Sequence, residues 1–131
     1  MTRQPPTTIL VAEDDPSLLL LTCRALEQAG HRVLGNGSAE EALATYERAP
    51  GVDALVTDVV LPGIDGLELA SRLLARQPEL AVLVTTGSTE AHIHEAAAAA
   101  GLRVLRKPYT PAHLLAAFTE AWGDRRAEVQ P

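Results

Sequence analysis

Apolar residues fall into five short runs along the chain, and the stretches between them have the spacing of helices. The runs are rich in Val, Ile, Leu and Ala, which is typical of strands buried on both faces of a parallel sheet. In the third intervening stretch, Leu69, Ala70 and Leu73 would share one face of a helix. The predicted strands cover residues 8–12, 31–34, 53–57, 80–85 and 102–105.

Helix-starting and helix-ending residues frame the stretches between these strands. Asp15 precedes Pro16 in the order of an N-cap followed by proline at the first helical position, and the pair at 110–111 repeats this order. Ser38 and Glu41 have the spacing of a capping box. A glycine or a proline follows each stretch and is expected to end the helix. The predicted helices cover residues 16–29, 39–49, 67–77, 89–100 and 111–122.

The regular alternation of strands and helices predicts the fold class. A parallel sheet with helices on both faces and right-handed crossovers has this alternation, whereas an eight-stranded barrel needs a much longer chain. We expect a flavodoxin-like, doubly wound α/β fold with five parallel strands in the order 2-1-3-4-5 and five helices. The domain is expected to span residues 8–123, between an N-terminal tail at 1–7 and a polar C-terminal tail at 124–131.

Composition and charge exclude several classes of protein. The 131 residues suffice for one domain with its own core. The formal net charge of −6 argues against direct DNA binding, which requires a basic face. The single cysteine, Cys23, excludes an internal disulfide and fits a reducing compartment. The N-terminus lacks the apolar stretch of a signal peptide, and the leucine run at 18–21 is too short to cross a membrane. We therefore expect a cytoplasmic protein with no membrane insertion.

Chemically active side chains follow the strands at the edge where such a sheet binds ligands. Three neighbouring carboxylates repel one another unless a cation neutralises them, and Mg²⁺ prefers carboxylate oxygens with water. We predict that Asp14 and Asp58 bind Mg²⁺ directly and that Glu13 acts through water. The residues at this edge are Glu13 and Asp14 after the first strand, Asp58 after the third, Thr86 after the fourth, and Lys107, the only lysine of the chain, after the fifth.

The same group of side chains suits a phosphoryl group. Lys107 and the cation would offset the charge on phosphoryl oxygens, and the Thr86 hydroxyl would donate a hydrogen bond to one of them. A carboxylate can act as a nucleophile and form an acyl phosphate. Asp58 is the best candidate because it lies centrally, at the switch point of the predicted sheet.

Four segments resemble the response regulator receiver domains of two-component signalling, in their single-domain form. Residues 9–15, Ile-Leu-Val-Ala-Glu-Asp-Asp, resemble the first strand and acidic pair of that family. Residues 58–66, Asp-Val-Val-Leu-Pro-Gly-Ile-Asp-Gly, resemble its phosphoacceptor loop. Residues 82–87 resemble its fourth strand with the switch hydroxyl, and residues 105–109 resemble the segment with its lysine. The resemblance extends over about residues 8–122.

The resemblance implies a function in a phosphorelay. Asp58 would accept a phosphoryl group from the phosphohistidine of a sensor histidine kinase or of a phosphotransfer protein. Mg²⁺ would be held by Asp14, by Asp58 and by the backbone carbonyl of Val60, with Glu13 completing the acidic pocket. The family is not an enzyme class beyond this self-phosphorylation and the autodephosphorylation that follows.

The resemblance also implies how the signal leaves the domain. Thr86 and Lys107 would hold the phosphate and draw their loops toward it, and the Lys107–Pro108 bond would be cis. This shift would repack the face formed by the fourth helix, the fifth strand and the fifth helix, so that phosphorylation biases a two-state element. The signal would pass by protein–protein contact to a downstream target that the sequence does not identify.

Four positions depart from the family pattern or are expected to modulate the response to phosphorylation. The family often has Tyr or Phe where this chain has Val104, so we expect a shift of the loop after the fourth strand in place of a ring rotation. Gly87 would give that loop more freedom. Val60 and Ser88 occupy positions that flank the attacking water in the family, and we expect them to set the lifetime of the phosphate.

Alternative functions make different demands on the sequence. A haloacid-dehalogenase-type phosphatase needs a second acid two residues after its nucleophile, where this chain has Val60, and a flavin binder needs a Ser/Thr/Gly-rich phosphate loop. A degenerate receiver that binds partners without phosphorylation would lack one of the key residues, and none is lost. A receiver excised from a hybrid histidine kinase stays open, although the starting Met1 favours a free protein.

Overall fold

The computed structural model describes residues 7–87 and 91–129. Strands and helices alternate along this part of the chain, as the hydrophobic pattern predicts. The strands are β1 (Thr8–Ala12), β2 (Arg32–Asn36), β3 (Ala54–Asp58), β4 (Ala81–Thr86) and β5 (Arg103–Arg106). The helices are α1 (Pro16–Gln28), α2 (Ala39–Arg48), α3 (Gly66–Arg76), α4 (Ala91–Ala99) and α5 (Pro111–Val129).

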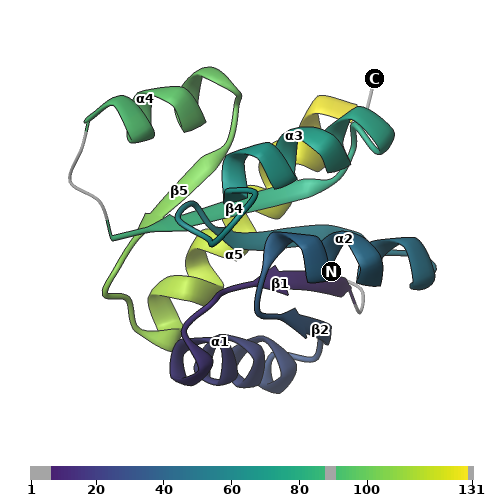
Figure 1. Ribbon diagram of the computed structural model, residues 1–131, viewed down its shortest axis with the longest axis vertical. Coiled ribbons are helices and arrows are strands. Elements are labelled where there is room, and N and C mark those ends of the chain that lie inside the picture. The colour runs from purple at the N-terminus through teal and green to yellow at the C-terminus, as the bar shows by residue number, and fades with distance from the viewer. Residues whose placement is uncertain (1–6, 88–90, 130–131) are drawn as a thin grey trace.

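The strands form one parallel sheet in the order β2-β1-β3-β4-β5, which confirms the predicted fold class and strand order. Helices α1 and α5 cover one face of this sheet, and α2, α3 and α4 cover the other (Figure 1). All five strands therefore have their carboxyl ends at one edge of the sheet. The order along the sheet reverses between β1 and β3, so the switch point lies between their ends.

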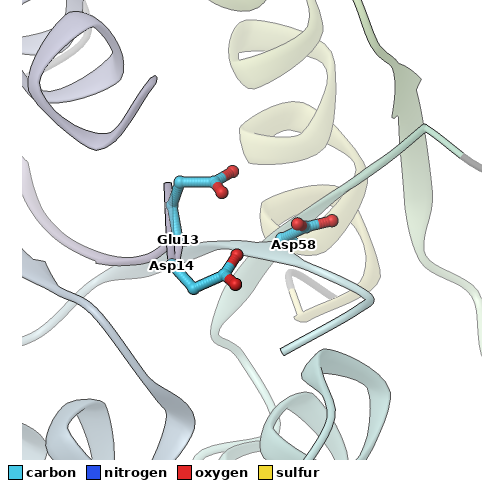
Figure 2. A group of neighbouring side chains, drawn as sticks. All are labelled: Glu13, Asp14 and Asp58. Atoms are coloured by element: carbon cyan, nitrogen blue, oxygen red, sulfur yellow. The ribbon is translucent and has the colours of Figure 1, made fainter. Parts of the chain in front are cut away.

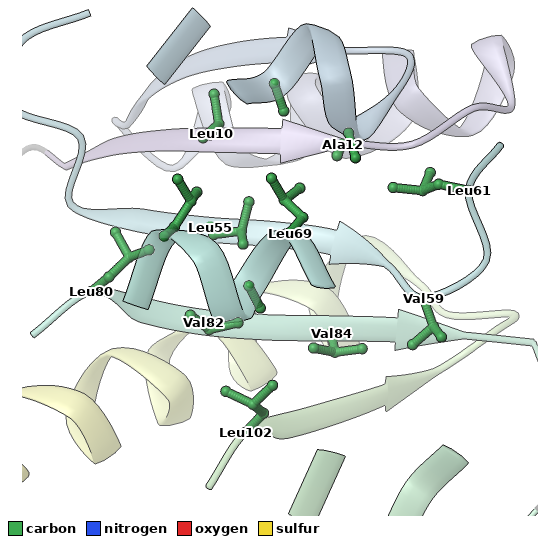
Figure 3. Close-up of a cluster of buried hydrophobic side chains, with 14 of the residues drawn as sticks. Leu10, Ala12, Leu55, Val59, Leu61, Leu69, Leu80, Val82, Val84 and Leu102 are labelled. Atoms are coloured by element: carbon green, nitrogen blue, oxygen red, sulfur yellow. The ribbon is translucent and has the colours of Figure 1, made fainter. Parts of the chain in front are cut away.

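Alternation of side chains along the strands divides the core into two clusters. Leu10 points into the cluster beneath α2 and α3, whereas its neighbours Ile9 and Val11 point into the cluster beneath α1 and α5. Figure 3 shows the first cluster, in which Leu55 and Leu69 pack between β3 and α3. Because both faces are buried, the strands carry near-continuous apolar runs.

Side-chain caps begin the helices at the predicted residues. The Asp15 carboxylate accepts hydrogen bonds from the backbone N–H groups of Ser17 and Leu18, with Pro16 at the start of α1. The Ser38 hydroxyl accepts a bond from the N–H of Glu41 and caps α2. These caps satisfy N–H groups that the first helical turn leaves without partners.

The last helix is longer than the sequence predicts. It continues through Gly123 to Val129, so the prediction that it ends at Gly123 was wrong. Glycine ends a helix when its φ is positive, and Gly123 is not among the glycines with positive φ. Asp124, beyond the expected end, lies 2.9 Å from the guanidinium of Arg103 on β5, and this ion pair anchors the added turn.

Other predicted limits differ by small amounts. Strand β2 runs from Arg32 to Asn36 and not from 31 to 34, because pairing with β1 extends through Gly35 and Asn36. The predicted start of the fourth helix at Thr89 lies outside the described residues. Among the described residues, no helix has the length and apolarity needed to cross a membrane.

Candidate functional site

Three carboxylates meet at the carboxyl ends of the neighbouring strands β1 and β3. Glu13 and Asp14 directly follow β1, and Asp58 is the last residue of β3. One oxygen from each carboxylate lies within 4.8 Å of the others (Figure 2). Glu13 and Asp58 are buried, with 4% and 6% of their surface exposed, whereas Asp14 faces solvent. The structure thus brings together the three acids that the sequence singles out.

Lys107 also contacts this cluster, although it follows β5, which is separated from β3 by β4. It directly follows β5, and its Nζ lies 2.9 Å from Glu13 Oε1 and 2.9 Å from Asp58 Oδ2. Its backbone N–H donates to the carbonyl of Thr86, at 2.8 Å, which fixes the start of the turn after β5. The Lys107–Pro108 peptide bond is cis, as the family resemblance implies.

Thr86 is the last residue of β4 and is fully buried. In the β3–β4 ladder Asp58 pairs with Thr85, so Thr86 lies one residue beyond this pair at the same edge. Gly87 follows it and is exposed, next to the Lys107 side chain. Ser88, one of the predicted modulating residues, lies outside the described residues. The position in β5 where the family often has an aromatic ring is occupied by the half-buried side chain of Val104.

Burial and the charges of the cluster shift two pKa values upward. Burial raises the pKa of Glu13, and the neighbouring charge of Asp58 adds to this, although a hydrogen bond from the Asp15 N–H opposes it. Burial alone would lower the pKa of Lys107, but its hydrogen bonds to Asp58 and Glu13 outweigh this effect and raise it. One ammonium cannot balance three carboxylates, so the site favours a further cation.

The donor set fits a magnesium ion. It consists of carboxylate oxygens from Asp14, Asp58 and Glu13, with no cysteine or histidine among them, and Mg²⁺ selects hard oxygen ligands. Asp14 is exposed, which lets the ion keep several of its waters. Asp58 at the base of the site and Asp14 at its rim would hold the ion, and Glu13 already shares its charge with Lys107.

The loop between β3 and α3 forms the other wall of the site. Val60, two residues after Asp58, has 63% of its surface exposed. The N–H of Gly66 donates to the carbonyl of Val59, at 2.8 Å, which closes the loop, and Asp65 caps α3 by accepting from the Glu68 N–H. A backbone bond near Asp58 and the side-chain cap at Asp65 therefore hold the shape of the loop.

Two contacts of the site were not predicted from the sequence. The carboxylate of Glu40, on α2, accepts a hydrogen bond at 3.1 Å from the backbone N–H of Ile64 in the β3–α3 loop, and this bond lowers the pKa of Glu40. The hydroxyl of Tyr109 lies 2.9 Å from the hydroxyl of Thr22 on α1. Both contacts join distant segments, and no local pattern marks them. The only sequence signal for the second is the position of Tyr109 two residues after Lys107.

Comparisons with known proteins agree with this geometry. A family model described as the response regulator receiver domain matches residues 9–119. The response regulator receiver protein CpdR of Brucella abortus is 33% identical over 102 residues, which cover 77% of this chain and 84% of CpdR. A receiver domain protein (CheY-like) from Methanospirillum hungatei is 27% identical, with a TM-score of 0.84 over 94% of this chain and 98% of that one.

Other relatives are much longer than this chain. The sensor kinase CckA of Brucella abortus is 33% identical over 105 residues, which cover 79% of this chain but 11% of CckA. The DNA-binding transcriptional regulator NtrC of Azospirillum brasilense is 31% identical over 115 residues, and the match covers 24% of it. The same domain is therefore found alone and as a small part of larger proteins.

Proposed function

This chain belongs to the response regulator receiver domain family of two-component systems, and we propose that Asp58 is its phosphoacceptor. The observation that carries the proposal is the contact of Asp58 with Lys107 inside an acidic pocket that also holds Glu13 and Asp14. Asp58 contacts the lysine and is the last residue of β3, at the switch point where ligands of this fold bind.

The phosphoryl transfer follows from the positions of these groups. An oxygen of the Asp58 carboxylate attacks the phosphorus of a phosphohistidine, a P–O bond forms, and the P–N bond breaks with its electron pair returning to the imidazole nitrogen. Lys107 offsets negative charge on the phosphoryl oxygens, and Thr86 at the end of β4 donates its hydroxyl to one of them. Mg²⁺, when bound by Asp14, Asp58 and the Val60 carbonyl, supplies further charge neutralisation.

We infer that the partners are a sensor histidine kinase or a phosphotransfer protein upstream, and a protein target downstream, in the cytoplasm. Receiver domains as a family interact with both kinds of protein. The net charge of −6 argues against direct DNA binding, which requires a basic face. The match to part of the sensor kinase CckA keeps a receiver from a hybrid kinase as the second candidate.

Intact mass after incubation with acetyl phosphate and Mg²⁺ tests the proposal. We expect the wild-type protein to gain one phosphoryl group and Asp58→Asn to gain none, because the amide is not a nucleophile of comparable strength. A chelator should prevent the gain in the wild type. A wild-type protein that gains nothing supports a binding module that works without phosphorylation, and a phosphorylated Asp58→Asn protein removes Asp58 from the proposed function.

The lifetime of the acyl phosphate is expected to depend on Val60. Its exposed side chain presents no polar group to a water that attacks the phosphoryl group, so Val60→Asn should shorten the lifetime several-fold without abolishing phosphorylation. Decay of the phosphorylated mass over time measures this. Leu21→Asn, at an exposed apolar residue of α1, is the matched control and should decay as the wild type does. Equal decay of all three proteins would contradict the prediction.

A further inference from the structure

A hydrogen bond between two hydroxyl groups ties the turn that carries Lys107 to helix α1. Tyr109 lies two residues after Lys107, and its hydroxyl oxygen is 2.9 Å from Thr22 Oγ1. Thr22 is 2% exposed and belongs to the middle of α1. The Tyr109 ring packs against the apolar cluster beneath α1 and α5, so the hydroxyl is the polar end of an otherwise apolar contact.

This bond completes a closed ring of interactions around the site. Lys107 Nζ binds Glu13 Oε1, and the second oxygen of Glu13 accepts the N–H of Asp15 at 3.1 Å. Asp15 caps α1, and α1 carries Thr22, which returns the chain of contacts to Tyr109 and hence to Lys107. Helix α1 thus joins the acidic side of the site to the turn that carries its lysine.

The lysine needs such an anchor because its side chain is long and flexible. A lysine loses rotamer entropy when its ammonium is held at one point, and a mobile backbone would add to that cost. On one side the turn is fixed by the bond from the Lys107 N–H to the Thr86 carbonyl. On the other side, the bond between Tyr109 and Thr22 fixes it. The two anchors together set where the ammonium can reach.

We propose that Tyr109 is a positioning residue that, through its bond to Thr22, holds Lys107 where it binds the phosphoryl group and couples that group to helix α1. The inference rests on the proposed function, because it assigns Lys107 to the phosphoryl group. In β5 this chain has Val104, where the family often has an aromatic residue. The contact of Tyr109 lies on the opposite face of the sheet from Val104. The exposed Leu20 and Leu21 directly precede Thr22, so α1 presents an apolar surface beside the coupled residue.

Binding of beryllofluoride, a phosphoryl mimic, to the full chain in the presence of Mg²⁺ tests this proposal. Tyr109→Phe removes the hydroxyl and keeps the ring, and we expect it to weaken beryllofluoride binding about threefold to tenfold, as the loss of one hydrogen bond predicts. Thr22→Val should have the same effect, and the double variant should be no weaker than either single one. Thr22→Ser, which keeps the hydroxyl, should bind as the wild type does.

Two further measurements separate positioning from a general loss of structure. Mg²⁺ affinity without beryllofluoride should not fall in Tyr109→Phe, because the proposed metal ligands lie at and just beyond the ends of β1 and β3. The matched control is Tyr46→Phe, whose hydroxyl donates to Gln77 at 2.7 Å between α2 and the end of α3, and it should leave beryllofluoride affinity unchanged. Amide resonances of α1 should shift when beryllofluoride binds the wild type, and shift less in Tyr109→Phe.

The outcomes distinguish this inference from the proposed function. A wild-type protein that does not bind beryllofluoride overturns the proposed function and this inference with it. A wild type that binds, with Tyr109→Phe and Thr22→Val binding equally well, overturns only the role of Tyr109. Equal weakening of Mg²⁺ and beryllofluoride binding in Tyr109→Phe, or weakening in Tyr46→Phe, also overturns it, because the hydroxyl would then act through stability alone.

Discussion

Replacing Gly66 with alanine is expected to lower the free energy of unfolding by about 3 kcal/mol and to abolish phosphorylation of Asp58. A β-carbon on Gly66 would lie 1.8 Å from the backbone carbonyl oxygen of Asp58 and 2.9 Å from Thr57 Oγ1. The first distance is far inside van der Waals contact, and the atom in the way belongs to the backbone of a buried strand. The clash can therefore be removed only if α3 or the end of β3 moves.

The same movement would disturb the site. Asp58 lies at the end of β3, its carboxylate is 2.9 Å from Lys107 Nζ, and the two other acids each have an oxygen within 4.8 Å of one of its oxygens. A shift of the Asp58 backbone would separate the side chain from these partners. Urea denaturation measures the stability, and intact mass after acetyl phosphate treatment measures the phosphorylation.

Gly123→Ala is the matched control for the Gly66 substitution. Gly123 lies inside α5, and apart from its chain neighbours and the nearby backbone of its own helix, no heavy atom of the described residues lies within 4 Å of the position its β-carbon would take. Alanine is a better helix former than glycine by about 1 kcal/mol, so this variant should be more stable than the wild type and should be phosphorylated normally. A Gly66→Ala protein as stable as the wild type would show that the close approach of α3 to Asp58 is not required.

The strands, the helix caps and the acidic cluster could be predicted from the sequence because each leaves a local signal. Buried parallel strands show as apolar runs, and Asp15 and Ser38 precede helices at cap positions. Glu13, Asp14 and Asp58 follow strands, and the topology of a parallel sheet brings strand ends together. The structure brings these acids and Lys107 together, as expected from the strand order.

The features that escaped prediction depend on contacts between distant residues. A glycine such as Gly123 is typical of a helix end, but α5 continues past it, and the ion pair of Asp124 with Arg103 stabilises this continuation. The bond between Tyr109 and Thr22 joins residues 87 positions apart, and its distance is set by how α1 and α5 pack. Hydrogen bonds of side chains on different elements have no periodicity, so a single sequence does not reveal them.

Magnesium is expected to stabilise this protein against unfolding, and Asp14 is expected to be essential for that effect. A ligand that binds only the folded state, at one hundred times its dissociation constant, adds about 2.7 kcal/mol to the free energy of unfolding. Asp14→Asn removes one carboxylate from the cluster that would hold the ion. We expect Asp14→Asn to be more stable than the wild type without Mg²⁺, because fewer like charges meet, and to gain little when Mg²⁺ is added.

Asp15→Asn is the control for charge alone, since it removes one negative charge from the next residue along the chain. Asparagine caps helices about as well as aspartate, so α1 should keep its start. Asp15 does not belong to the acidic cluster, and its carboxylate accepts the N–H groups of Ser17 and Leu18. Asp15→Asn should therefore respond to Mg²⁺ almost as the wild type does in thermal or urea denaturation. If both variants lost the response equally, diffuse attraction to the acidic surface would explain it, and no ion would need to be bound at Asp14 and Asp58.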